Sequence, residues 1–478
     1  MVRALRRPSE KDLRPSMIGI DTGPKSNMEH LSNVARLSDT SIHDWYRHVF
    51  AYSDQIIVDL ANEFEIEEDD LVLDPFNGTA TTTLAAKRLG IDAIGVDANP
   101  VATLAGRVKT TWDIDLDEFE QRRADLLRTL EPVFNSISAD GNVTLRSYTD
   151  SDENDDTSLE KYDFTEPQKT PKDWLSEKPL KKMLVLRHHV DEMPDDEITD
   201  IFRLAMLAIL PEDVANIGFG PEAYKVAKQE DVDIYATYRA KLDDIQQDLS
   251  TVQDALDEEM VVGESEHLRG DAREIEQLLR EASTLLNTGK HDGEVDYVIT
   301  SPPYPAEHDY TRNQRLELIW MGVLENNSDL QNIKKSNIRS NTKNIYVDDD
   351  EGEQVTIRAN GRIDAIVTEM EQIIEEEDVQ HGFGQYYPRV VEEYFAGMQR
   401  HLEQTYDLLA PGGKACYVVA DSGSYWQVPI ETGEILGELA ENRVGFVDAE
   451  LLPWRTVHAT TGDHDGLDEE ILVLTRPE

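Results

Sequence analysis

The chain has 478 residues, of which 39% are hydrophobic and 7% aromatic, and its formal net charge at pH 7 is −51. It contains no run of 18 or more apolar residues and no apolar segment behind its charged N-terminus, so we expect neither a membrane span nor a secretion signal. The single cysteine, Cys416, excludes an internal disulfide and a multi-cysteine metal site, and together these features predict a cytoplasmic protein.

The N-terminal quarter of the chain predicts a parallel strand–helix–strand unit. Residues 1–40 form a basic, polar arm, and an amphipathic helix is expected within 41–64. Residues 71–90 then have the pattern of a strand, a tight loop and a helix. A second strand follows and ends at Asp97, which gives the order and spacing of a βαβ unit.

The rest of the chain alternates between helical and sheet-like segments. After a long acidic stretch with helical periodicity, sheet-like sequence resumes at 269–275 and again at 295–300. We expect a first core segment at 41–110, a helical and acidic insertion at 111–262, a second core segment at 263–322, a mixed insertion at 323–385 and a last core segment at 386–478.

The loop "DPFNGTATTT", residues 74–83, is the first candidate site. Small residues between a strand and a helix let the backbone approach a ligand, and the helix start offers unpaired N–H groups. An ordinary turn would look similar, but Asp97 lies 23 positions beyond Asp74, at the end of the next strand. An acidic residue there accepts hydrogen bonds from ribose hydroxyls in nucleotide-binding α/β folds. Asp271, in "RGDAREI", could reach an adenine amino group or simply cap a helix.

The second candidate site is the motif "ITSPPY", residues 299–304, which follows an apolar, β-branched run. Two adjacent prolines stiffen the chain and remove two N–H donors. The motif therefore presents a hydroxyl, a rigid carbonyl and a flat ring in fixed positions, which suits a planar base with an amino group. Ser301 and the Pro302 carbonyl would accept the two amino N–H bonds, while the ring of Tyr304 would stack on the base.

These motifs resemble those of amino-group DNA methyltransferases that use S-adenosylmethionine. The resemblance rests on "DPFNGTATTT", "GVDANP" and "ITSPPY", with support from "HDWYRHVFAYSDQIIVDL" and "APGGKACYVVADS". It covers roughly 41–109, 265–322 and 386–476, a little over half of the chain. It implies an α/β fold, the Rossmann-like class I methyltransferase fold, with a seven-stranded, mostly parallel sheet into which the helical segment is inserted.

The resemblance also assigns residues to roles. Asp97 and Ala98 would bind the ribose of the cofactor, and Asp271 and Ala272 its adenine. The loop and strand ends near the methionine and sugar would contribute Asp74, Pro75, Phe76, Gly78, Thr79 and Thr300. The pocket for the target base would comprise Ser301, Pro302, Pro303 and Tyr304. The chain departs from the family at Ala80, where a second glycine is usual and where a methyl group puts cofactor affinity in doubt.

Double-stranded DNA is the implied partner, although the chain is strongly acidic. Arg outnumbers Lys and acidic runs extend along the chain, a composition that resembles proteins of salt-loving archaea. Positive charge gathers in a few stretches, which are solvated loops or helix ends in many proteins and which we expect here to contact phosphates. The residues expected to bind DNA are Arg312, Arg315, Lys334, Lys335 and Arg339. His188 and His189 are not assigned to a metal, because no third ligand is spaced to join them.

The favoured function is a site-specific DNA methyltransferase acting on cytosine N4, in restriction–modification or another self-marking system, with a cognate restriction nuclease as a conceivable partner. "SPPY" is typical of cytosine-N4 enzymes, whereas adenine-N6 enzymes more often have an acidic residue or Asn at the position of Ser301. Methylation at carbon 5 needs a cysteine nucleophile, and Cys416 lies in an expected buried strand. An adenine-N6 enzyme, an RNA base methyltransferase and a degenerate DNA-binding subunit of a defence system remain alternatives.

Overall fold

A seven-stranded sheet organises the computed structural model, which describes residues 37, 40–47, 52–139, 159–219, 223–287, 289–306, 308–345, 357–379, 381–423, 425–457 and 467–478. The strand order is β5-β2-β1-β6-β7-β9-β8, and only β9 runs opposite to the others. This confirms the predicted α/β fold with a mostly parallel sheet. The strands are β1 (Leu71–Asp74), β2 (Asp92–Asp97), β5 (Ser265–Arg269), β6 (Val295–Thr300), β7 (Leu409–Ala420), β8 (Val447–Val457) and β9 (Leu467–Thr475).

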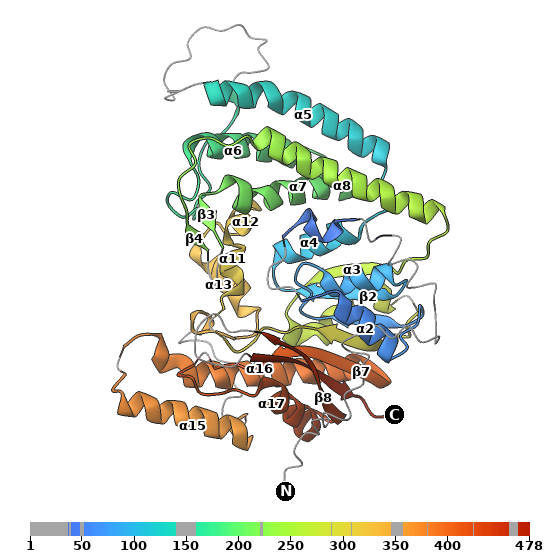
Figure 1. Cartoon of the computed structure of the whole chain (residues 1–478), viewed down its shortest axis with the longest axis vertical. Coiled ribbons are helices and arrows are strands. Elements are labelled where there is room, and N and C mark those ends of the chain that lie inside the picture. Colours follow the sequence, from blue (N-terminus) through green and yellow to red (C-terminus); the bar gives the residue numbers. More distant parts are fainter. Residues whose placement is uncertain are drawn as a thin grey trace.

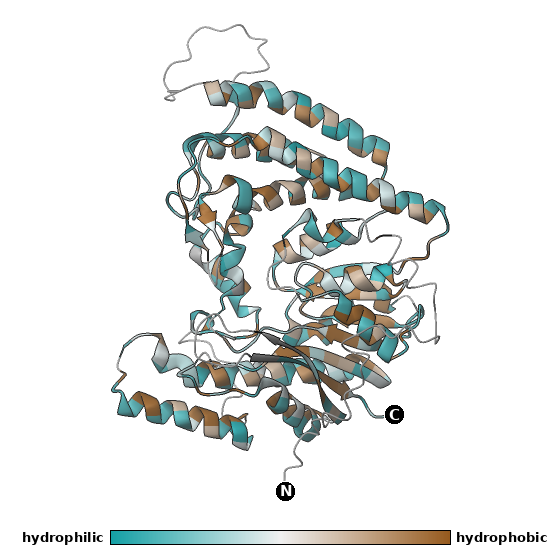
Figure 2. Ribbon diagram, in the orientation of Figure 1, coloured by the Kyte–Doolittle hydropathy of each residue, from teal (hydrophilic) through white to brown (hydrophobic). Residues whose placement is uncertain are grey.

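Helices cover both faces of this sheet, which is why its central strands consist mainly of buried apolar residues. One face packs against α2 (Gln55–Glu63) and α3 (Thr81–Arg88), through residues such as Ile56, Leu60 and Ala86. The other face packs against α9 (Ile275–Ala282), α10 (Thr284–Asn287), α16 (Tyr387–Leu408) and α17 (Thr432–Leu439), and α15 (Gly361–Glu376) packs against α16 (Figure 1). Figure 2 shows hydrophobic residues concentrated on the central strands, with hydrophilic bands along the helices.

Residues between β2 and β5 form a separate group of helices, which lies at the top of Figure 1. The group comprises α5 (Leu116–Ala139), α6 (Glu177–Asp191), α7 (Glu197–Ile209) and α8 (Ile234–Asp257), with a short hairpin of β3 (Ile217–Gly218) and β4 (Tyr224–Lys225). Its core is continuous with residues of α4 (Pro100–Thr110) such as Leu104 and Val108. The helix α4 therefore joins the helical group to the sheet.

A third group of short elements follows β6. It comprises α11 (Tyr310–Asn313), α12 (Arg315–Trp320), α13 (Asn327–Lys335) and the short helix η6 (Thr342–Asn344). Trp320 and Leu318 of α12 belong to the same core as the helical group. This places the chain that follows the "SPPY" motif between the sheet and the helices.

One expected strand lies elsewhere in the chain, and one expected segment falls outside the described residues. The strand expected over 269–275 is wrong in its position, because β5 ends at Arg269 and the chain turns into a 3-10 helix, η5 (Ala272–Glu274). The Asp271 side chain accepts a hydrogen bond from the Arg273 backbone, which starts that turn. The basic arm expected at 1–40 lies outside the described residues, apart from Leu37 and Thr40.

Candidate active site

A cleft of about 410 Å³ opens at the carboxyl ends of β1, β2 and β6. The chain runs outward from β1 to β2 and β5 and then returns to place β6 on the other side of β1, so the strand order reverses at this point. Open α/β sheets bind their ligands in the crevice beyond the strand ends at such a reversal. The volume of the cleft falls within the roughly 300–1,000 Å³ that is usual for small-molecule sites.

The structure brings most of the expected site residues to this cleft. Those on the cofactor side are Pro75, Phe76, Gly78, Thr79, Asp97, Ala98 and Ala272. Those on the base side are Ser301, Pro302, Pro303 and Tyr304. The two motifs, more than 200 residues apart in the chain, therefore share one cavity.

The loop between β1 and α3 forms the floor of the cofactor side. Gly78 has φ +51° and Ala80 has φ +76°, so both lie in the left-handed region. This conformation is free of steric cost for glycine but costs other residues about 1–2 kcal/mol. Ala80 is completely buried and is the N-cap of α3. The departure noted in the sequence thus falls at a position where glycine would be the relaxed choice.

Two polar groups of this side are suited to a nucleoside ligand. The Asp97 carboxylate accepts the Gly78 N–H (2.9 Å) and the Asn99 N–H (2.7 Å) and still lines the cleft. Burial raises the pKa of Asp97 to about 6, against the opposing effect of these two N–H groups. Thr79 lines the same cleft, and its buried hydroxyl has no hydrogen-bond partner among the described residues. A ligand with vicinal hydroxyls and a polar tail would satisfy both groups.

Asp74 and Thr300 were also expected at the cofactor, but neither lines the cleft. Both are buried, and the Thr300 hydroxyl donates to the Asp74 carboxylate at 2.6 Å, which ties the end of β6 to the end of β1. Asp74 also accepts hydrogen bonds from the Thr82 hydroxyl and the Phe76 N–H. Burial raises the pKa of Asp74 to about 6, despite these donors. Asp74 and Thr300 therefore connect the loop after β1 to the loop after β6 without lining the cleft.

Asp271, expected at the adenine, is engaged by Arg273. The guanidinium of Arg273 donates to both Asp271 oxygens, at 2.9 and 2.6 Å. Asp271 does not line the cleft, whereas its neighbours Gly270 and Ala272 do. This matches the alternative in which Asp271 caps a helix, while the backbone around it borders the site.

The loop after β6 forms the base side of the cleft. The Ser301 hydroxyl and the Tyr304 hydroxyl lie 3.2 Å apart, within hydrogen-bond distance. Thr300 is buried and Pro302 is nearly so, while Ser301 and Tyr304 are half-buried. The stiff loop therefore holds a hydroxyl and an aromatic ring together at the mouth of the cofactor side.

The cleft is also lined by residues that have no role assigned from the sequence. Tyr52 comes from the segment before α2, and its hydroxyl contacts Thr82 and Asp74. Gln314 follows α11 and bonds to Asn99, which stands two residues after Asp97. Glu469 of β9 reaches the base side from the far end of the sequence. Tyr52 lies within "HDWYRHVFAYSDQIIVDL" and Asn99 within "GVDANP", so the motifs include these two positions, whereas Gln314 and Glu469 lie outside them.

The residues expected to bind DNA divide into two sets. Lys334 is buried and bonds to Asp309 at 2.6 Å, and Arg339 is buried and bonds to Glu393 at 2.8 Å. The expectation that these two cations face phosphates is therefore corrected, because both are committed to internal carboxylates. Lys335 is exposed, and Arg312 and Arg315 are half-buried beside the cleft-lining Thr311 and Gln314.

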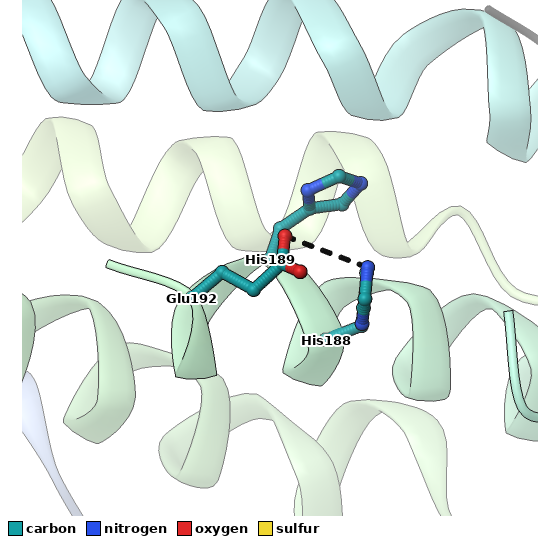
Figure 3. Close-up of side chains that lie close together, drawn as sticks. All are labelled: His188, His189 and Glu192. Carbon is teal, nitrogen blue, oxygen red and sulfur yellow. Dashed lines mark ion pairs between the residues drawn. The ribbon is translucent and has the colours of Figure 1, made fainter. Parts of the chain in front are cut away.

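A histidine pair in the helical group also differs from expectation. Glu192 lies one helical turn beyond His188, and potential ligand atoms of His188, His189 and Glu192 all lie within 4.8 Å of one another (Figure 3). The expectation that no third ligand lies near the two histidines is therefore wrong. His188 pairs with Glu192 at 3.5 Å, and His189 bonds to the Tyr162 hydroxyl at 2.9 Å. None of the three lines the cleft.

Parts of the chain are similar in sequence to known DNA methyltransferases. A family model described as DNA methylase matches residues 47–104. The type II methyltransferase M.BsoBI of Geobacillus stearothermophilus is 25% identical over 311 residues, which are 60% of this chain and 53% of that protein. The type II methyltransferase M.AvaI, from a Nostoc species and from Anabaena variabilis, is 21% identical over 416 residues, 84% of this chain and 78% of that protein.

The chain thus spans about half the length of the first of these relatives and more than three quarters of the others. No solved structure matches. The segment that holds β1, α3, β2 and the cofactor side of the cleft is similar to DNA methylases, and a larger part of the chain is similar to type II methyltransferases.

Proposed function

We propose that this protein is a DNA methyltransferase that transfers a methyl group from S-adenosylmethionine to the exocyclic amino group of a flipped base, cytosine N4 in preference to adenine N6. One observation carries the proposal: the "SPPY" loop, the glycine loop after β1 and Asp97 line a single cleft. Methyl transfer between two bound molecules requires that their pockets adjoin, with the reacting atoms about 3–3.5 Å apart. The two sides of this cleft provide adjoining pockets.

The cofactor side fits the expected methyl donor. DNA methyltransferases of this family use S-adenosylmethionine, which supplies a methyl group activated by a sulfonium charge. Asp97 would accept the ribose hydroxyls, as an ionised carboxylate with two backbone donors already in place. The unsatisfied Thr79 hydroxyl would bond to the polar end of the cofactor, and Phe76 and Ala272 would border its rings.

The base side fits a planar base with an amino group. A base inside a duplex is stacked and paired, so it must first be flipped out, at a cost of a few kcal/mol. The Ser301 hydroxyl and the Pro302 carbonyl would accept the two amino N–H bonds, which directs the nitrogen lone pair toward the methyl group. Tyr304 would stack on the base. Its hydroxyl, which now contacts Ser301, would give up that contact when the base enters.

Cytosine N4 is preferred because the pocket presents a neutral hydroxyl at Ser301, where adenine-N6 enzymes more often have an acidic residue or Asn. Carbon-5 methylation is disfavoured by the state of the only cysteine. Cys416 is fully buried in β7, and burial raises the pKa of its thiol to about 12, so it is no thiolate nucleophile.

Duplex DNA is proposed as the substrate because the relatives are type II methyltransferases and the matching family is one of DNA methylases. On the same basis we propose a place in a restriction–modification system, alongside a cognate nuclease. The alternative of a degenerate DNA-binding subunit rests on Ala80, which is completely buried and does not itself line the cleft. Among the described residues, no helix is both long and apolar enough to cross a membrane.

Single-molecule sequencing of DNA from cells that express the protein tests the proposal. The wild-type protein should introduce N4-methylcytosine in one sequence context, and Ser301→Ala and Asp97→Ala should remove most of it. N6-methyladenine in place of methylcytosine would overturn the cytosine assignment but keep the enzyme class. Unmodified DNA from cells that contain folded wild-type protein would overturn the function, and modification confined to RNA would favour the RNA alternative.

A further inference from the structure

Lys109, on α4, is completely buried behind the cofactor side of the cleft. Its ammonium donates to the carbonyl oxygens of Tyr46 (3.1 Å) and Thr79 (3.2 Å). Among the described residues it forms no ion pair, in contrast to the other buried lysines, Lys182 and Lys334, which bond to Asp231 and Asp309.

A buried ammonium without a carboxylate partner is costly, because two carbonyl dipoles replace only part of its hydration. Burial accordingly lowers the pKa of Lys109 to about 7. Asp44 acts to raise this pKa, and Lys241 acts to lower it. Methionine or leucine would fill the same space at no electrostatic cost. A role for the two hydrogen bonds explains why a lysine occupies the position.

The Thr79 carbonyl belongs to the peptide that joins Thr79 to Ala80. The orientation of this peptide sets φ of Ala80, which is +76°. An L-residue resists that angle, and the peptide would relax by rotating, which would turn the Thr79 carbonyl away from α4. A hydrogen bond from a fixed ammonium to this carbonyl opposes the rotation.

The Tyr46 carbonyl belongs to the segment before α2, on the other side of Lys109. The Tyr46 hydroxyl bonds to Glu317 (2.8 Å), and Gln314 bonds to both Tyr46 and Asn99. Lys109 therefore joins the glycine loop to a buried network that reaches the Asp97 loop and the chain after the "SPPY" motif.

We propose that Lys109 is a positioning residue for the methyl donor: its ammonium holds the Thr79–Ala80 peptide in the left-handed turn that this chain builds without the usual glycine. The inference rests on the proposed function, because it takes the cleft to be the S-adenosylmethionine site. Lys109 itself does not line the cleft, so it acts through the loop.

Binding of S-adenosylmethionine to the full chain in molar KCl tests this. Calorimetry would compare wild type, Lys109→Met, Ala80→Gly and the double variant. Lys109→Met should raise Kd about tenfold, because the Thr79–Ala80 peptide loses the hydrogen bond that holds it. Glycine adopts the turn unaided, so the double variant should return to within about threefold of Ala80→Gly alone.

Lys182→Met is the matched control, since it removes a buried lysine in the helical group, away from the cleft. It should lower the unfolding temperature and leave Kd unchanged. Methyl transfer at saturating S-adenosylmethionine should be nearly the same in Lys109→Met and wild type, because only the binding of the donor is affected. If Lys109→Met does not fold, Lys109→Gln, which keeps an N–H donor group on a shorter side chain, should fold and show an intermediate Kd.

Two results would overturn the inference alone: an unchanged Kd in folded Lys109→Met or Lys109→Gln, or a double variant as weak as Lys109→Met. A purely structural role would give the second result, because glycine at position 80 could not repair it. A wild-type protein that does not bind S-adenosylmethionine would instead refute the proposed function, and the inference with it.

Discussion

Asp97 shows how the burial of a single residue sets the properties of the cofactor side. Asp97 is held by two backbone N–H groups, yet burial raises the pKa of its carboxyl from 3.8 to about 6. Between pH 4 and 6 the folded protein therefore binds a proton that the unfolded chain releases. The contribution of Asp97 to the free energy of unfolding is consequently largest at low pH and is lost as the pH rises through 6.

The dependence of cofactor binding on pH should have the opposite sign. Only the ionised Asp97 can accept two ribose hydroxyls while it keeps its backbone donors, so protons compete with the cofactor. We expect Kd for S-adenosylmethionine to be constant near pH 7 and to rise about tenfold per unit below pH 6. Calorimetry between pH 5 and 7 measures this. Asp97→Asn should bind weakly at every pH; if it keeps the wild-type slope, another group is responsible.

Tyr304 allows stacking to be separated from hydrogen bonding at the base side. Tyr304→Phe removes the hydroxyl, which lies 3.2 Å from that of Ser301, but keeps the ring, and it should keep kcat/KM for DNA within about threefold. Tyr304→Ala loses the stacking surface, worth about 1–3 kcal/mol per base, and should lower kcat/KM about 10- to 100-fold. Kd for S-adenosylmethionine serves as the control and should not change. Equal losses in both variants would mean that the hydroxyl, and not the ring, is needed.

At the scale of elements, the segment from α13 to η6 is fixed by internal ion pairs. Asp309 and Lys334 are both buried and bond at 2.6 Å. Burial alone would raise the pKa of Asp309, but the ammonium of Lys334, the Thr311 hydroxyl and Lys343 together outweigh it, and the pKa is lowered. The pair therefore stabilises the fold near neutral pH and loses this effect as Asp309 becomes protonated in acid. It anchors α13 next to the loop that carries the base pocket.

Lys334→Met should consequently destabilise the protein, although its sequence context suggested a surface contact. Removing one member of a buried pair leaves the other charge unsatisfied, which costs about 3–5 kcal/mol. Urea unfolding measures this, with the exposed neighbour Lys335→Met expected to change the free energy of unfolding by less than about 0.5 kcal/mol. Lys334→Met/Asp309→Asn should recover part of the loss. A loss as large in the double variant would mean that packing, not charge, is responsible.

These pairs also show what the sequence could not reveal. Strand–loop–helix order is local, so the pattern of 71–97 predicted β1, α3 and β2, and the "SPPY" motif predicted the base side. The partners of Lys334 and Arg339 are 25 and 54 residues away, and a run of cations does not tell which way each side chain points. Gln314 lies outside both motifs, and Glu469 reaches the cleft because β9 lies two strands away from β6 in the sheet, so no local pattern marked either residue.

The whole molecule is held together by contacts between distant parts of the chain. The indole of Trp45 bonds to Asp248 of α8 at 2.8 Å, and the hydroxyl of Tyr46 bonds to Glu317 of α12 at 2.8 Å. The short segment 41–47 thus links the helical group to the chain after the base pocket, next to the carbonyl that Lys109 holds. Hydrogen bonds therefore connect the helical group and α4 to the chain beside the cleft.

The net charge of −51 acts on this whole assembly, and its effect should depend strongly on salt. Self-repulsion destabilises a compact state, and the distance over which charges interact falls from about 10 Å at 0.1 M salt to about 3 Å at 1 M. We expect the thermal unfolding midpoint to rise by several degrees between 0.1 and 2 M KCl. Scanning calorimetry measures it, with sucrose at matched osmolality as the control for effects unrelated to charge. A midpoint that does not change with KCl, or that sucrose raises equally, would show that the acidic surface does not govern stability.

The acidic surface also repels DNA phosphates, and the same salt screens this repulsion. Cofactor-dependent methylation should therefore increase as KCl rises above about 0.1 M, until the salt also weakens the phosphate contacts of the protein and reverses the trend.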